Sequence, residues 1–176
     1  MDIFSHGLWA GAAYKAINKR VKKPLNVLLA GFWGIFPDLF AFTIPFVWLF
    51  WNLIFGGLNF SDIPRPEEVE PVQKDVFPVF RLASMLYSIS HSAIIFLAVF
   101  GIIYLVFRRP IWELGGWFIH IIFDIPTHSY KFYPTPFLWP FSDWTFNGFS
   151  WGTLRFLIPN YAAIIIIYLL LRNKKS

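Results

Sequence analysis

The chain contains no cysteine and few charged residues. Of its 176 residues 14% are charged and 57% are hydrophobic, whereas soluble domains carry about a quarter charged residues. The absence of cysteine excludes disulfides and metal sites built from thiolates. The shortage of charge, together with a mean hydropathy of +0.55, predicts a membrane protein. At this length we expect one membrane-embedded domain, residues 1–176.

The net charge of +5 does not predict a nucleic-acid partner, because the basic residues are not spread over one face. Ten of the fifteen Lys and Arg residues form three short clusters, each beside an apolar run. This distribution is typical of the cytoplasmic ends of membrane spans. The clusters are Lys15, Lys19, Arg20, Lys22 and Lys23; Arg108 and Arg109; and Arg172, Lys174 and Lys175.

Long apolar runs predict an all-α, multi-pass transmembrane helical bundle with about four spans. Each run is long enough to cross about 30 Å of hydrocarbon. Residues 2–20 predict an additional N-terminal helix. Pro37 and Asp38 predict a broken helix with pieces at 25–36 and 39–58, because proline removes a backbone hydrogen bond and aspartate caps helices. The alternative is a proline kink with Asp38 turned to water. The four runs are residues 39–60, 82–107, 110–128 and 151–171.

Two loops are expected on the side opposite the basic clusters. Residues 61–81 are rich in proline and slightly acidic. Residues 129–151 are rich in aromatic residues, which favour the headgroup layer of a bilayer. We therefore expect the second loop to form an interfacial belt, with a lid or a lipid-contacting surface as the alternative.

The ionisable groups inside the apolar runs share one depth. At about 1.5 Å per helical residue, they lie roughly 17 to 25 Å from the basic ends. Unrelated structural histidines have no reason to share a layer, so this pattern predicts that the side chains converge. The groups are His6, Asp38, His91, His120 and Asp124.

The stretch "FIHIIFDIPTH" carries the strongest signal for a metal site. His120 and Asp124 are four residues apart and so share one face of a helix. Pro126 ends or bends that helix, which lets His128 fold back toward the pair. Imidazole nitrogen with carboxylate oxygen suits a divalent metal, and we expect one or two zinc ions. The alternative is a set of separate roles, such as a helix cap at Asp38 and a His120–Asp124 pair without metal.

The ordered motifs "SHGLWAG", "GIFPDLF", "SISHS" and "HIIFDIPTH" cover most of the chain. In this order they resemble the membrane-bound metal-dependent hydrolases, also called LexA-binding, inner-membrane-associated hydrolases. That family is distantly similar to zinc-dependent phospholipase C. The resemblance implies His6, Asp38, His91, His120 and Asp124 as metal ligands, and a prokaryotic cytoplasmic (inner) membrane as the location. The chain departs from many family members at "LYSISHS", where Tyr87 and Ser88 replace a His-Arg pair.

These features lead to one main hypothesis and two alternatives. The main hypothesis is hydrolysis of an ester or phosphoester, with a lipid as one candidate substrate and Asp124 or Asp38 as the base. The first alternative is transport or binding of a metal or of protons without hydrolysis, since ionisable groups inside membranes also mark ion pathways. The second is haem binding by His91 and His120. Membrane lipids are the expected partners.

Overall fold

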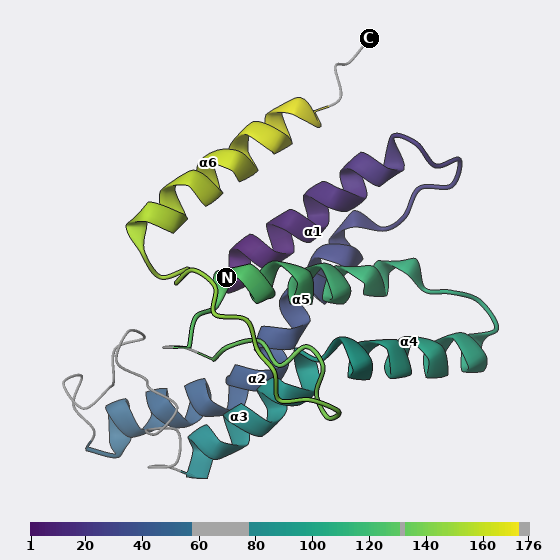
Figure 1. Ribbon diagram of the computed structural model, residues 1–176. Helices are drawn as coiled ribbons and strands as arrows, with labels where there is room; N and C mark the ends of the chain where they lie inside the picture. The colour runs from purple at the N-terminus through teal and green to yellow at the C-terminus, as the bar shows by residue number, and fades with distance from the viewer. Residues whose placement is uncertain (58–77, 131–132, 173–176) are drawn as a thin grey trace.

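The computed structural model describes residues 1–57, 78–130 and 133–172, and the regular elements in these ranges are all helices. This confirms the all-α class. Most of the predicted loop at residues 61–81 lies outside the described residues. Figure 1 shows the elements in chain order: α1 (Ile3–Asn18), α2 (Val27–Phe55), α3 (Pro78–Ser90), α4 (Ala93–Phe107), the 3₁₀ turn η3 (Trp112–Leu114), α5 (Gly115–Thr127) and α6 (Leu154–Leu170).

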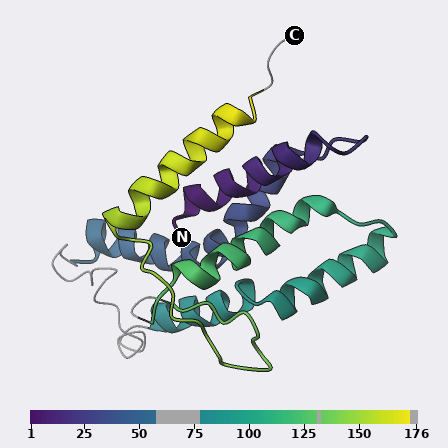
Figure 2. The same cartoon turned by 45° about the horizontal axis from the view of Figure 1, so that its top comes forward.

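The predicted N-terminal helix is α1. Asp2 caps it by accepting a hydrogen bond from the Ser5 backbone N–H at 3.0 Å, which satisfies one of the open N–H groups of the first turn. Both views show α1 running alongside α6, with the N-terminus near the end of α5 (Figures 1 and 2). This packing carries the first turn of α1 into the centre of the molecule.

Helix α2 is continuous through Pro37 and Pro45. The break predicted at Pro37 and Asp38 is therefore wrong. Each proline removes one hydrogen bond while the neighbouring bonds of the helix persist, so the helix bends instead of ending (Figures 1 and 2). Asp38 starts no new helix. It lies inside α2 with its side chain buried.

The break occurs in the next apolar run, which was expected to be one span over residues 82–107. Helices α3 and α4 meet at an angle of 62°. The backbone N–H of His91 still bonds the carbonyl of Tyr87, which closes α3. Ser92 then caps α4 by accepting from the Ile95 N–H at 3.2 Å. This bend leaves His91 at a helix end that points into the protein.

Among the described residues, one helix is long and apolar enough to cross a membrane, namely α2. The bent pair α3 and α4 makes a second candidate if it is counted as one span. Helices α5 and α6 have 13 and 17 residues, fewer than the roughly 20 that a bilayer requires. The bundle of about four spans therefore stays a prediction.

Glycines let α1, α2 and α5 approach closely. A Cβ atom at Gly116 of α5 would lie 2.0 Å from the carbonyl oxygen of Ala30 in α2. One at Gly34 of α2 would lie 2.7 Å from the Ala10 Cβ and 2.9 Å from the His6 carbonyl oxygen in α1. Only residues without a side chain fit such contacts. The three backbones are therefore close enough for short polar side chains to meet between them.

Candidate metal centre

The structure brings all six predicted ligands together, and none of them is more than 5% exposed. They come from three helices and from the two residues that directly follow α3 and α5. They are His6 on α1, Asp38 on α2, His91 after the last turn of α3, His120 and Asp124 on α5, and His128 at the end of α5.

Four of the ligands form a compact set, which we call the first donor group: Asp38, His91, His120 and Asp124. One ligand atom of each lies within 4.8 Å of the others. His91 Nε2 and His120 Nε2 are 2.9 Å apart. Asp124 Oδ2 lies 3.3 Å from the first and 3.2 Å from the second. Asp38 Oδ1 lies 3.5 Å from His91 Nε2 and 3.8 Å from His120 Nε2.

These separations fit a tetrahedral ion. Four donors bound at about 2.0–2.1 Å in a tetrahedron are about 3.3 Å from one another. The five distances given above, from 2.9 to 3.8 Å, lie around this value. The first donor group therefore has the composition and the spacing of a site that could hold a divalent metal ion.

The hydrogen bonds of the two imidazoles indicate where their protons are. His120 Nδ1 lies 2.7 Å from the Gly34 carbonyl oxygen, and His91 Nδ1 lies 3.1 Å from the Tyr87 carbonyl oxygen. A carbonyl oxygen only accepts, so neutral His120 carries its proton on Nδ1. His91 Nδ1 also lies 2.9 Å from the Ser90 hydroxyl oxygen, a group that can either donate or accept. Where both neutral rings carry the proton on Nδ1, the two Nε2 atoms point their lone pairs at each other and at two carboxylates, and a cation resolves that repulsion.

The remaining contacts gather around the other oxygen of Asp124, and we call them the second donor group. His6 Nε2 lies 2.8 Å and His128 Nε2 lies 3.3 Å from Asp124 Oδ1. The amino group of Met1 lies 2.6 Å from Asp124 Oδ1 and 2.8 Å from His128 Nε2. An ammonium group can donate to both acceptors. In the structure, then, the second donor group has a positive partner beside it.

Unpartnered atoms mark the space between the two groups. Asp124 Oδ2 and both ring nitrogens of His6 are buried and make no aligned hydrogen bond among the described residues. His6 also stacks on His120, with ring centroids 3.6 Å apart. Buried polar atoms without partners are costly in apolar surroundings. The residues present therefore fit a bound cation.

Two participants were not predicted as part of the site. The amino group of Met1 has no local signal, because its contacts depend on how α1 packs against α5. Tyr87 was noted only as a departure from the family pattern. It lies one turn before His91 on α3, stacks on that ring with centroids 3.7 Å apart, and places its hydroxyl 3.0 Å from His128 Nδ1. The four-residue spacing from His91 could have suggested it.

A polar network between α1 and α6 supports the first turn of α1. Asn160 donates to Ser5 Oγ at 2.7 Å and accepts from Trp9 Nε1 at 2.9 Å. Tyr161 donates to Asp2 Oδ1 at 2.8 Å. Burial raises the pKa of the Asp2 carboxyl, but hydrogen bonds from Ser5 and Tyr161 outweigh it and hold that pKa below its ordinary value. This network fixes the end of α1 that presents His6.

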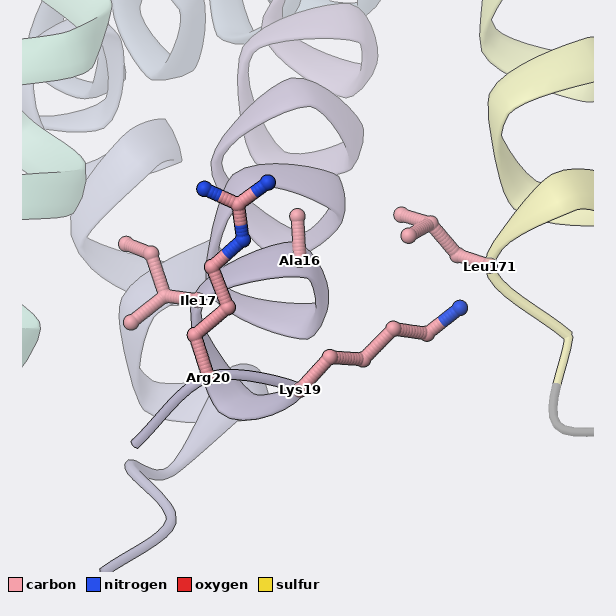
Figure 3. Close-up of a pocket in the computed structure, with 5 residues that line it drawn as sticks. All are labelled: Ala16, Ile17, Lys19, Arg20 and Leu171. Carbon is pink, nitrogen blue, oxygen red and sulfur yellow. The ribbon is translucent and has the colours of Figure 1, made fainter. Parts of the chain in front are cut away.

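A cleft of about 420 Å³ lies elsewhere, between the C-terminal ends of α1 and α6 (Figure 3). Lys19 reaches across it and donates to the Leu170 carbonyl oxygen at 3.4 Å, as suits a basic side chain at the negative end of a helix. His6 and Lys19 are thirteen residues apart on α1, or about 20 Å. The cleft is thus separate from the donor groups. Its lining residues are Ala16, Ile17, Lys19, Arg20 and Leu171.

The geometry opposes the haem alternative. Two axial histidines stand on opposite faces of a porphyrin, whereas His91 Nε2 and His120 Nε2 are 2.9 Å apart. That gap leaves no room for a haem between them.

No family model, curated protein or solved structure matches the chain. Membership of the metal-dependent hydrolase family therefore stays a prediction, as does the relation to phospholipase C.

Proposed function

We propose that this chain is an integral membrane protein that holds a divalent metal ion, best suited to zinc, in the first donor group. One observation carries the proposal: His91 Nε2 and His120 Nε2 lie 2.9 Å apart beside two buried carboxylates. Two acids this close, away from water, are stable only with a cation or with added protons. A metal satisfies all four donors at once. A second ion between His6, His128 and Asp124 would have to displace the amino group of Met1.

The proposed reaction is hydrolysis of an ester or phosphoester, with a lipid as one candidate substrate. It rests on the motif resemblance and on the chemistry of the donors. A bound divalent ion would supply a Lewis acid that polarises the scissile group. Both oxygens of Asp124 already face imidazoles. Asp38, at 5% exposure, is the less enclosed acid. Where it is not used as a metal ligand, it is the better candidate to accept a proton from the attacking water.

The surface supports a bilayer environment. Large apolar side chains are exposed along the whole of α2, α4 and α6. A soluble domain exposes such side chains only at scattered single positions. Examples are Leu28 at 87%, Val47 at 63%, Val106 at 68% and Leu170 at 72% exposure. We place the basic cluster after α1 at the cytoplasmic side of a prokaryotic inner membrane, as its charge favours.

The metal is tested by elemental analysis of protein purified in detergent. We expect about one equivalent of zinc in the wild type and almost none in the double variant His120→Ala, Asp124→Ala. Thr127→Val serves as the matched control, because Thr127 is a buried polar residue of the same helix whose hydroxyl bonds the Phe123 carbonyl oxygen. Equal, negligible metal in wild type and double variant would refute the site.

The reaction is tested separately, once metal is found. Chromogenic ester and phosphoester substrates, soluble and in lipid micelles, are assayed with the metal-loaded wild type and with Asp38→Asn. Hydrolysis that needs metal and falls at least tenfold in the variant supports the proposal. A fully metal-loaded wild type that cleaves none of these substrates would count against the enzyme.

A second candidate function is passage of the metal or of protons through the membrane. The complete burial of His91, His120 and Asp124 favours passage, because an ion held among these side chains has no direct contact with the water on either side of the membrane. Sealed vesicles loaded with a zinc-sensitive dye separate the two functions. Zinc flux that stops in the double variant, without hydrolysis, would establish transport and end the hydrolase proposal.

A further inference from the structure

We propose that Tyr87 is a positioning residue of this centre: its hydroxyl group holds His128 in the Nδ1–H form, so that Nε2 faces Asp124 as an acceptor. This inference rests on the proposed function for its effect on metal binding. The positioning itself is a property of the side chains alone and has its own readout.

The hydroxyl of Tyr87 closes a triangle of hydrogen bonds. It donates to the Tyr133 carbonyl oxygen at 2.9 Å and lies 3.0 Å from His128 Nδ1. His128 Nδ1 itself lies 2.8 Å from the same carbonyl oxygen. A lone pair on Nδ1 would repel that oxygen, so Nδ1 carries the proton and shares it between the carbonyl and the phenol.

The position of this proton decides whether His128 Nε2 donates or accepts a hydrogen bond in the centre. With the proton on Nδ1, the neutral ring turns an unprotonated Nε2 toward the Met1 amino group, 2.8 Å away, and toward Asp124 Oδ1. In the other tautomer, with the proton on Nε2, His128 would donate a hydrogen bond to Asp124 Oδ1. That bond would withdraw electron density from the carboxylate whose second oxygen faces His91 and His120. Tyr87 therefore keeps His128 from adding a further hydrogen bond to Asp124 Oδ1.

The same residue also acts on the first donor group. Its ring stacks on His91 with an interplanar angle of 22°, and its carbonyl oxygen accepts from His91 Nδ1. Tyr87 is 2% exposed and lies on α3, one turn before His91. One residue thereby orients two histidines, one through its ring and backbone and the other through its hydroxyl.

The test is Tyr87→Phe, which keeps the ring on His91 and removes only the hydroxyl. The control is Tyr168→Phe, which also loses one tyrosine hydrogen bond to a carbonyl, that of Leu8 at 3.0 Å in the contact of α6 with α1. Nitrogen-15 NMR of histidine-labelled protein reports the protonated nitrogen, and the His128 signal is assigned by its loss in His128→Gln. Zinc affinity is measured in parallel by competition with a chelator.

We expect wild-type His128 to be in the Nδ1–H form, and Tyr87→Phe to show a measurable Nε2–H population with zinc bound roughly tenfold more weakly. Tyr168→Phe should change neither. Wild-type His128 in the Nε2–H form would overturn the inference, even if the variant failed to fold. So would a Tyr87→Phe protein with the wild-type form and affinity, or an equal loss in both variants. If the wild type binds no zinc but the NMR change appears, the metal proposal fails and the positioning role stands.

Discussion

Asp2 and Asp38 both adjoin apolar helices, and their surroundings give them opposite roles. Asp2 is partly exposed, accepts hydrogen bonds from Ser5 and Tyr161, and caps α1. Asp38 lies inside α2, faces two imidazole nitrogens and has little contact with solvent. A carboxylate that accepts several hydrogen bonds stabilises a fold by itself, whereas a buried one among imidazoles needs a cation or added protons.

The role of Asp2 predicts a pH-dependent loss of stability in Asp2→Asn. Asparagine still caps a helix but carries no charge. Because the folded pKa of Asp2 lies below its ordinary value of 3.8, the charge stabilises the fold above that value, and the stabilisation is lost as the pH falls through the folded pKa. We expect a lower unfolding temperature for the variant at pH 7, and a smaller difference from wild type below about pH 3.8. Zinc content should not change. A difference that stays constant from pH 7 to pH 3 would contradict this role.

The proximity of the candidate ligands was predictable where the signal is local or follows from depth. His120 and Asp124 share a helix face, and the layer argument adds His6, Asp38 and His91 from other helices. The contacts of Tyr87 with His128 join residues 41 positions apart, and those of Met1 depend on packing of α1 against α5. No spacing rule reaches such pairs, because they are set by how helices pack.

Close packing of α5 against α2 helps to bring the residues of the centre together. Gly116 lets the backbone of α5 meet α2 near Ala30 and Gly34. The same contact brings His120 Nδ1 within 2.7 Å of the Gly34 carbonyl oxygen. The hydrogen bond that orients the His120 ring therefore depends on the close approach of the two helices.

Gly116→Ala should lower both stability and zinc content. Its Cβ would lie 2.0 Å from the Ala30 carbonyl oxygen, a backbone atom that moves only with its helix. We expect a loss of about 1–3 kcal/mol in the free energy of unfolding, as for other overpacked sites. Gly101→Ala on α4 is the control, since no heavy atom lies within 4 Å of its Cβ, and it should be neutral or gain up to about 1 kcal/mol. Denaturant unfolding and elemental analysis measure both. Similar behaviour of the two variants would show that the close approach is not required.

Element boundaries were less predictable than element type. The apolar runs correctly indicated helices, and the N-terminal helix at residues 2–20 matches α1. The break was expected at Pro37 and occurs at His91 and Ser92 instead. Proline weakens a helix by one hydrogen bond, which packing of α2 against its neighbours outweighs. A serine cap inside an apolar run ends a helix only when a tertiary contact supports the turn, here the hydrogen bond from Ser92 Oγ to the Trp139 carbonyl oxygen.

At the scale of the molecule, a polar centre lies inside a shell of apolar side chains. The buried set contains three histidines and an aspartate at 0 to 1% exposure, while many leucine, isoleucine and phenylalanine side chains on the helices are exposed. Soluble proteins show the reverse arrangement. The proposed hydrocarbon around the helices would remove the cost of those exposed side chains and increase the cost of any unpaired charge within.

This arrangement predicts that a lysine is tolerated at one end of α2 and rejected in its middle. Leu28 and Ile44 are both exposed apolar residues of α2, at 87% and 52%. Leu28→Lys places its charge near the basic cluster, where a long side chain reaches the headgroups. Ile44→Lys places a charge near the bilayer centre, at a cost of about 2.5–3.5 kcal/mol. We expect the first variant to stay in the membrane fraction after an alkaline wash, as the wild type does, and the second to be depleted several-fold. In water both lysines would be harmless on an exposed surface, so equal recovery of the two variants would contradict a bilayer around α2.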